Sequence, residues 1–525
     1  MHVAFYGATG EVTGSFHTVV TDRDTTLLDC GLFQGRRKET EAKNRVLPVD
    51  PKIFTNMVLS HAHIDHSGRI PMLTRDGFSG HIFCTRATAH ACKYLLRDSA
   101  KIQEGDAAYL NYKTAKVFLA KLKTGGEQAK ISAADQQEIK ALLKSGDHDL
   151  RLDVVEKLLR ENNLERITPL YTLAEAEESL GYFQGVPLHQ TVTIGTELFC
   201  TFYGAGHILG SAMSVIQYKA EGQTKTVLYS GDLGRFDKPI IKDPTLDFAE
   251  EHRDIDLMIM ESTYGSRVHE PVTDMKPMLK KVLTETFARG GSVIIPAFAY
   301  GRTQELLYFM HELFLAKEIP PMPVWVDSPL ATDMTNVFGE HPETYDEETH
   351  ESFLRKGLNP FDFEQLKFVQ SVEESMALNR ESKSHIVLAG SGMCEGGRVL
   401  HHLRHKIHDE RNTVLIVGYM GQNTFGRRLQ ELGEKYQADG RRGEPPMVRF
   451  YNKDYPLKAR VVTLGGFSAH GDRQEMTRVL KESNLVIKKI ALVHGEEEQT
   501  QGFAEYLRRE GFNVVVPFHG QSVFV

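Results

Sequence analysis

The sequence predicts an α/β protein with more than one structural unit, and three observations support this. Short apolar segments bounded by turn residues predict successive strands at 2–6, 16–21, 25–29 and 56–60. From 292 to 418 strands alternate with helices, as they do around a parallel sheet. The chain has 525 residues, which exceeds one ordinary hydrophobic core. We therefore expect two or three domains, or one domain with a large insertion.

The pattern changes twice between these regions. From about 99 to 178 the chain is rich in Ala, Leu, Lys, Glu and Gln and has little β-branching, which predicts a helical excursion. Strand signals return at 192–203, 212–218, 226–230 and 257–260, so a sheet resumes there.

The remaining elements follow in order to the end of the chain. We predict further strands at 292–296, 324–327, 385–389, 413–418, 460–464 and 489–493. We predict helices at 302–315, 398–405, 473–482 and 498–510. The Gly, Arg and Pro cluster at 440–446 predicts an exposed connection. The segment 7–14 partly imitates a dinucleotide-binding loop, but the strand pattern after it indicates a hairpin turn.

Composition and charge exclude several classes of protein. No run approaches the roughly 20 apolar residues of a membrane span, and residues 1–20 lack the features of a secretory signal. We therefore expect no membrane association and a cytoplasmic location. The 5 cysteines are scattered without CxxC pairs, which predicts reduced core residues. The net charge of −8 gives no general attraction to a polyanion, so a nucleic acid would need a local basic surface or bound metal ions.

Histidine and aspartate concentrate in one short segment, HAHIDH at 61–66, directly after an apolar run. His61 and His63 alternate, so they project together from an extended loop, and Asp65 and His66 can turn toward a second ion. A solvated histidine-rich turn is the alternative, and random placement rarely produces this spacing between a strand and a helix. The segment therefore predicts a metal site.

Two later segments each supply one further ligand-type residue. His207 in GHILGS and Asp232 in SGDLG both follow a predicted strand, and both have flanking glycines that permit close backbone approach. Taken alone, His207 reads as a buried structural histidine and Asp232 as a turn aspartate. Together with the first motif, both are better explained as metal ligands.

This order of motifs resembles the metallo-β-lactamase superfamily, and Asp29 in LLDCG matches the aspartate that supports its ligand loop by hydrogen bonding. Glu261 in MESTYG, His470 in GFSAH and His494 in LVHGE match three motifs of its β-CASP branch, which processes nucleic acids. The resemblance implies a four-layer αββα domain with an inserted α/β cap. We expect the first part of that domain at 1–261, the β-CASP cap at 262–457 and the last part at 458–525.

The resemblance also implies a role for each site residue. His61, His63 and His207 would bind one zinc ion, Asp65, His66 and His494 the other, and Asp232 would bridge both. The two ions would activate a hydroxide, with manganese or iron as alternatives to zinc. Asp65 and Asp232 would thereby serve catalysis, and His470 would be the general acid, oriented by Glu261. The expected products carry a 5′ phosphate and a 3′ hydroxyl.

The substrate implied by the resemblance is single-stranded RNA. The position of His494 is typically apolar in the DNA-acting members of the branch and histidine in the RNA-acting members. Arg302, Ser391 and Gly392 lie after predicted strands, where backbone amides and a guanidinium could hold phosphates.

Other basic residues are read differently. Arg398, Arg404 and Arg427 would add charge along the cap, although such arginines are more often a solvated helix face. The histidines at 401, 402, 405 and 408 match none of the family's ligands, so we reject them as a metal site.

Three alternatives remain at this stage. A thioester or lactone hydrolase on the same zinc scaffold would leave Glu261, His470 and the cap unexplained. A DNA nuclease would share the chemistry. A scaffold subunit that is not an enzyme is disfavoured because every expected ligand is present. The sequence leaves open the balance of endonuclease and 5′-3′ exonuclease action, and whether the chain forms a homodimer.

Overall fold

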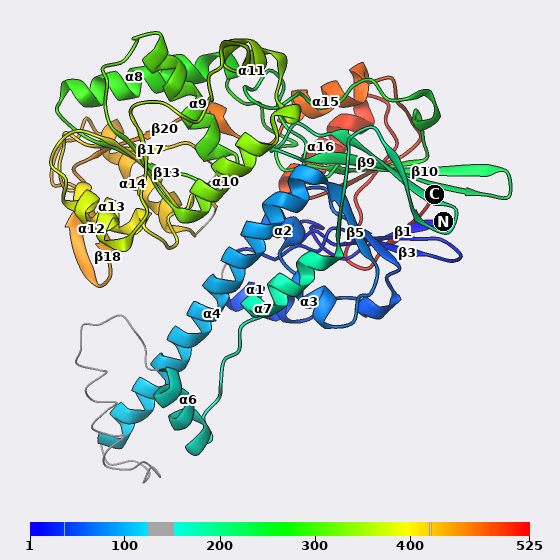
Figure 1. The fold of residues 1–525 in the computed structure, drawn as a ribbon, viewed down its shortest axis with the longest axis horizontal. Helices are drawn as coiled ribbons and strands as arrows, with labels where there is room; N and C mark the ends of the chain where they lie inside the picture. The colour runs from blue at the N-terminus through cyan, green and yellow to red at the C-terminus, as the bar shows by residue number, and fades with distance from the viewer. Residues whose placement is uncertain (36, 124–151, 419, 422) are drawn as a thin grey trace.

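The computed structural model describes residues 1–35, 37–123, 152–418, 420–421 and 423–525. Two sheets face each other in one part of the molecule, a third sheet lies in a second part, and one long helix projects from the body (Figure 1). The predicted α/β class is confirmed.

The first sheet joins the two ends of the chain, which lie side by side in Figure 1. β1 pairs antiparallel with β2 and β24, while the pairs from β3 to β6 are parallel. Segment 7–14 lies between the antiparallel strands β1 and β2, as expected for a hairpin connection. The strand order is β24 (Ser522–Phe524), β1 (His2–Phe5), β2 (His17–Val20), β3 (Thr25–Leu28), β4 (Asn56–Val58), β5 (His81–Thr85) and β6 (Phe183–Val186).

The second sheet contains three neighbouring parallel strands, β10, β12 and β22, on which the site is built. Its strand order is β23 (Val514–Val515), β22 (Ile490–Val493), β12 (Leu257–Glu261), β10 (Gln223–Tyr229), β9 (Ala212–Ala220), β8 (Leu198–Gly204) and β7 (Thr191–Gly195). The sequence predicts a single strand over 192–203, and this is wrong. Glu197 has a φ of 58°, and Thr196 N–H donates to the Asp24 carboxylate, so the chain turns there into a hairpin.

Packing on the sheet faces produces the predicted four layers. Val19 and Leu28 of the first sheet belong to the same buried cluster as Ile216 and Ile259 of the second, so the inner faces share one core. The outer face of the first sheet packs on α2 (Ile64–Ser67), α3 (Ile70–Arg75) and the start of α4 (Arg86–Lys123), and that of the second on α15 (Arg473–Glu482) and α16 (Glu497–Arg509). This is the αββα arrangement.

The third sheet is parallel throughout, in the order β15 (Leu366–Phe368), β14 (Val324–Asp327), β16 (Ile386–Ala389), β13 (Val293–Pro296), β17 (Thr413–Ile416) and β20 (Arg460–Thr463). Its central strands are buried along their whole length and mostly apolar, because helices cover both faces. One face packs on α8 (Met275–Ala288), α9 (Arg302–Leu315) and α10 (Pro329–Glu340). The other packs on α12 (Val372–Arg380), α13 (Val399–Lys406) and α14 (Phe425–Ala438).

One predicted boundary is placed too early. We expect the last part of the hydrolase domain to begin at 458, but β20 pairs in parallel with β17 in the third sheet. Val461 of β20 is buried with Val414 and Ile416 of β17 in the core of that sheet. We therefore propose that the cap ends after Thr463. The exposed connection at 440–446 lies between α14 and β18 (Met447–Phe450), a strand of a small hairpin with β19 (Lys453–Pro456).

The described part of the helical excursion begins in α4, a helix of 38 residues that starts before it. The first half of α4 packs into the main core through Leu95 and Leu96. Farther along, Ala115 joins α6 (Leu152–Glu161) in a separate small cluster, and α7 (Leu173–Ser179) leads back to the body (Figure 1). Residues 124–151 of the predicted excursion lie outside the described residues. None of the helices in the described ranges is long and apolar enough to cross a membrane.

Acid should destabilise the protein through His385, at the start of β16. Burial lowers the pKa of its ring from 6.5 to about 4. Between these two pH values the ring is protonated in the unfolded chain and neutral in the folded chain. This contribution is complete above pH 6.5 and is lost as the pH falls toward 4, by up to about 3 kcal/mol. We expect Tm to fall less between pH 7 and 5 in His385→Asn than in the wild type.

A suitable control is His81→Asn, at an exposed histidine, which should lose as much Tm as the wild type over the same pH interval. An identical loss in His385→Asn and the wild type would remove the assigned role of His385.

Candidate metal centre and active site

The candidate site lies where five strands of the two facing sheets end. Asp232, Glu261 and His494 come at the carboxyl ends of the parallel strands β10, β12 and β22. Asp29 and the segment 61–66 follow the parallel strands β3 and β4. Carboxyl ends of parallel strands meet at one edge of a sheet, so residues more than 400 positions apart in the sequence converge.

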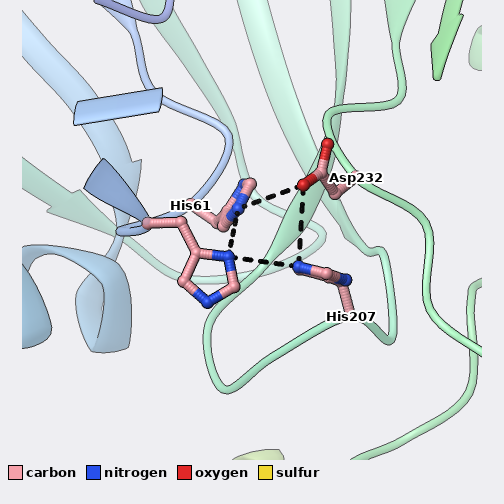
Figure 2. Close-up of side chains that lie close together, drawn as sticks. His61, His207 and Asp232 are labelled. Carbon is pink, nitrogen blue, oxygen red and sulfur yellow. Dashed lines mark hydrogen bonds and ion pairs between the residues drawn. The ribbon is translucent and has the colours of Figure 1, made fainter. Parts of the chain in front are cut away.

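The first group of side chains comes from three separate segments (Figure 2). His63 Nδ1 lies 3.1 Å from His61 Nε2 and 3.2 Å from His207 Nε2. Asp232 Oδ2 lies 3.5 Å from His61 Nε2 and 3.6 Å from His207 Nε2. Four potential ligand atoms therefore surround one point.

A second group lies on the other side of the same carboxylate. His66 Nε2 is 3.1 Å from His494 Nε2, which is 3.6 Å from Asp65 Oδ2. Asp232 Oδ1 lies 3.3 Å from His66 Nε2 and 3.5 Å from His494 Nδ1. The two oxygens of Asp232 thus face different groups, and all seven predicted ligands are brought together.

The donor atoms fit a metal site. Asp232 Oδ1 is buried without a hydrogen-bond partner, which is costly unless a cation completes it. Burial and the neighbouring imidazoles lower the pKa of His61 and His207 well below the usual value, and burial lowers that of His63 to about 4. Their rings are therefore neutral and have a lone pair to offer. Imidazole and carboxylate groups in this mixture suit zinc and related transition metals.

The second group attracts positive charge. Burial lowers the pKa of His66, but the carboxylates of Asp232 and Asp29 reverse this and raise it well above the usual value. Burial raises the pKa of Asp232, and His494 and His66 reverse that effect and hold it well below the usual value. Asp65 is likewise held ionised, chiefly by its hydrogen bond with His494, against the effect of burial.

Asp29 holds the ligand loop from behind. Its carboxylate accepts hydrogen bonds from Ser60 N–H at 2.8 Å, Ser60 Oγ at 2.8 Å, His66 Nδ1 at 2.6 Å and Tyr229 Oη at 2.5 Å. Gly31 lets the loop come this close, because a Cβ there would lie 1.6 Å from the Asp65 carbonyl oxygen. The sequence points to Asp29 but not to Ser60 or Tyr229, whose only signal is their position one and three residues before a ligand.

His470 stands beside the metal ligands and is held by Glu261. Its Nδ1 lies 3.1 Å from Glu261 Oε2 and 3.8 Å from Asp232 Oδ2, and its ring centre is 4.5 Å from that of His207. Burial lowers the pKa of His470, but Glu261 and Asp232 outweigh it and raise the pKa to about 9. Glu261 also accepts the backbone N–H of Leu233 at 2.5 Å, which fixes its orientation. His470 can therefore carry a proton that its Nε2 presents to a substrate.

Among the predicted phosphate-binding residues, Arg302 fits its expected role least well. Its side chain is buried and forms an ion pair with Glu305, which also lies 3.4 Å from Lys238 Nζ. Arg302 is therefore part of a buried group of charges, and could hold a phosphate directly only by giving up Glu305. Ser391 Oγ accepts the N–H groups of Glu395 and Gly396 in the loop after β16, next to Gly392.

The three other cap arginines considered from the sequence each have a partner nearby. Arg398 pairs with Asp327 at 2.6 Å, Arg427 with Glu431 at 2.8 Å, and Arg404 contacts His405 at 3.0 Å. His402 donates to Asp327 at 2.6 Å. In the described part of the chain, none of the groups arranged to hold a metal includes the histidines of α13.

Comparisons with known proteins place this geometry in context. Residues 303–429 match a family profile described as the Beta-Casp domain, and residues 454–517 one described as a Zn-dependent metallo-hydrolase RNA specificity domain. A solved structure, described as a protein of unknown function from Enterococcus faecalis V583, aligns with 100% of this chain and 99% of its own at a TM-score of 0.50. Its sequence identity is 12%, so this likeness concerns the fold alone.

Relatives with curated descriptions match along the whole chain. The chain is 32% identical over 524 residues to ribonuclease TTHA0252 of Thermus thermophilus, with 100% of both proteins covered. It is 26% identical to probable RNase MJ4 of Methanocaldococcus jannaschii, again with 100% of both covered. It is 28% identical to transcription termination factor FttA of the same organism, covering 97% of this chain and 69% of that protein.

Replacing Asp29 should weaken metal binding without removing a ligand. In Asp29→Asn one acceptor oxygen becomes an amide NH₂ that faces the donors Ser60, His66 and Tyr229, so His66 loses its fixed orientation. We expect zinc affinity to fall about 10- to 100-fold, measured by competition with a chromophoric chelator. The matched control is Asp24→Asn. The Asp24 carboxylate is also buried, but it accepts the N–H of Thr196 in a turn that is remote from the ligands. Equal affinity in Asp29→Asn and the wild type would contradict this role.

Proposed function

The chain belongs to the β-CASP ribonuclease family of the metallo-β-lactamase superfamily, and on that premise we propose that it is a zinc-dependent ribonuclease that hydrolyses single-stranded RNA. The observation that carries the proposal is the position of Asp232. Its two oxygens face different ligand groups. His470, which is held by the buried Glu261, lies beside them. A centre of this kind, with an acid at its edge, suits phosphodiester hydrolysis.

We assign His61, His63 and His207 to one ion, Asp65, His66 and His494 to the other, and Asp232 to both. Divalent ions held by these residues would supply an activated water and electrostatic stabilisation of the phosphodiester oxygens. The nitrogen-rich ligand set favours zinc over magnesium or calcium, which prefer oxygen ligands. Metal analysis of the purified protein distinguishes zinc from manganese and iron.

His470 supplies the proton that the leaving 3′ oxygen needs. The Glu261 carboxylate raises the pKa of His470, which favours the protonated ring that an acid requires at neutral pH. Glu261 engages Nδ1, so Nε2 is the nitrogen that donates. Protonation of the 3′ oxygen leaves a 3′ hydroxyl on one product and a 5′ phosphate on the other.

Several features favour RNA over other substrates. Two relatives that match over their full length are described as a ribonuclease and a probable RNase, and the second matched profile is described as an RNA specificity domain. His494 lies within the ligand group, as the resemblance to RNA-acting members implies. A small-molecule hydrolase would leave the Glu261–His470 pair and the cap without a function. We propose endonuclease action, and the length of the labelled products distinguishes it from 5′-3′ exonuclease action.

Removing the imidazole of His470 should abolish cleavage but leave the metal centre intact. We expect His470→Ala to lower kcat on a 5′-labelled single-stranded RNA by roughly 10²- to 10⁴-fold, with unchanged metal content. The control His401→Ala removes an imidazole from the surface of α13, where it stacks on Tyr451, and should retain activity. Cleavage of the matching DNA at an equal rate, or hydrolysis of a thioester or lactone without RNA cleavage, would overturn the proposal.

Removing the charge of Glu261 should change the pH dependence. Glu261 raises the pKa of His470, so Glu261→Gln lowers it, and the protonated acid is lost at a lower pH. The alkaline fall in kcat should therefore begin at a lower pH than in the wild type, while the metal content stays the same. A pH profile that only scales down, without moving, would mean that Glu261 acts merely in packing.

A further inference from the structure

The loop from β13 to α9, residues 297–301, carries an aromatic ring that packing does not explain. Phe298 is 40% exposed, although Ala297 and Tyr300 in the same loop are buried. Its backbone carbonyl accepts hydrogen bonds from Thr303 N at 3.3 Å and Thr303 Oγ1 at 2.8 Å. The first turn of α9 therefore fixes the position of this ring's backbone.

One face of the ring rests on glycine. A Cβ built on Gly392 would lie 2.7, 2.8 and 2.9 Å from three successive ring carbons of Phe298. Such nearly equal distances place Gly392 over the ring face, because a contact at the edge would be clearly shortest to one carbon. Gly418, at the end of β17, is a second neighbour, 3.5 and 3.8 Å from the ring by the same measure. Phe298 is therefore packed against glycine on one side and keeps 40% of its surface exposed.

The backbone of this loop runs close to the predicted metal ligands. Two residues farther along, Tyr300 donates its hydroxyl to the Leu209 carbonyl at 2.6 Å, and its ring centre is 6.2 Å from that of His63. A Cβ on the next residue, Gly301, would lie 3.2 Å from Ile208. Two residues span at most about 7 Å of chain, so the backbone of Phe298 lies within that distance of Tyr300.

Two polar residues, Ser391 and Arg398, stand near Gly392 in the loop after β16. Gly392 directly follows Ser391 in the loop after β16. Arg398 lies beside this loop, because the next residue, Val399, donates its N–H to Gly390. Its guanidinium is held by the fully buried Asp327 and stays about one quarter exposed. An exposed aromatic ring on the cap matches the aromatic base of a nucleotide, on which it could stack.

We propose that the open face of Phe298 stacks on one base of the RNA, close to the scissile phosphate, and fixes the position of the strand over the metal centre. The inference rests on the proposed ribonuclease function and names the contact on the cap that positions the substrate. Stacking on a ring is tolerant of sequence because every base has a π face. The ring therefore sets which phosphate is cut relative to the bound base, without selecting a base identity.

The test uses single-stranded RNA with one abasic nucleotide moved stepwise along it. In the wild type, loss of the base at one fixed position from the cut should raise KM by roughly 5- to 150-fold. Phe298→Leu keeps bulk against Gly392 but has no ring, so it should raise KM for intact RNA by a similar factor and show no further rise at that position. Phe298→Tyr keeps the ring and should restore the abasic dependence. Phe524→Ala, at an exposed phenylalanine of β24, is the matched control for loss of an aromatic surface.

The outcomes separate this inference from the proposed function. If the wild type cuts intact RNA but Phe298→Leu keeps the same abasic profile, the stacking role is wrong and the ribonuclease proposal stands. If the wild type hydrolyses bis(p-nitrophenyl) phosphate but cuts no RNA, the ribonuclease proposal fails first. If Phe298→Leu alters KM for every RNA and also retains the position of greatest abasic effect, the residue acts only in packing, which also overturns the inference.

Discussion

The structure depends on how one carboxylate, Asp232, is shared between two groups of ligands. Its oxygens lie 3.3 to 3.6 Å from four imidazoles that come from segments before and after it in the chain. Burying so many ionisable groups is costly unless each meets a partner, so the ends of β3, β4, β10, β12 and β22 must be held in fixed register. His494 can reach the group only because the last segment of the chain returns beside β12 and closes the first sheet through β24. The cap is thus inserted between the first and last parts of the hydrolase domain, and these two parts must still pack together.

The position of the cap is determined at its contact with the hydrolase domain. Tyr300 donates to Leu209 next to His207, and Lys238 and Arg302 share the buried carboxylate of Glu305. Burial lowers the pKa of Lys238 to about 8, and the Glu305 carboxylate opposes this effect. Separating the two domains at this contact would expose or unpair these charges, and unpaired buried charges are strongly destabilising. The contact therefore keeps the carboxyl edge of the third sheet beside the predicted metal ligands.

The sequence predicts the site better than the boundaries, for a physical reason. HAHIDH at 61–66, His207 and Asp232 are visible because ligand chemistry restricts residue type and spacing, and helix 302–315 is visible from its 3.6-residue period. The turn at Glu197 and the sheet to which β20 belongs depend on pairing partners far away, which local pattern does not encode. Tyr229 and Phe298 are ordinary aromatic residues in the sequence, and only their contacts with Asp29 and Gly392 distinguish them. Arg302 shows the opposite case, a residue whose type suggests phosphate binding but whose charge is already paired.

The distribution of charge constrains how this protein could hold a polyanion. The chain carries a net charge of −8, and several cap arginines are engaged by carboxylates within the protein. Affinity that comes from many phosphate contacts falls steeply with salt, because each contact releases counterions. Affinity that comes from metal ions at one phosphate and from stacking at one base involves few such contacts. On the proposed function, we expect cleavage of RNA to persist at moderate salt, because the binding energy is concentrated at the centre and not spread along the strand.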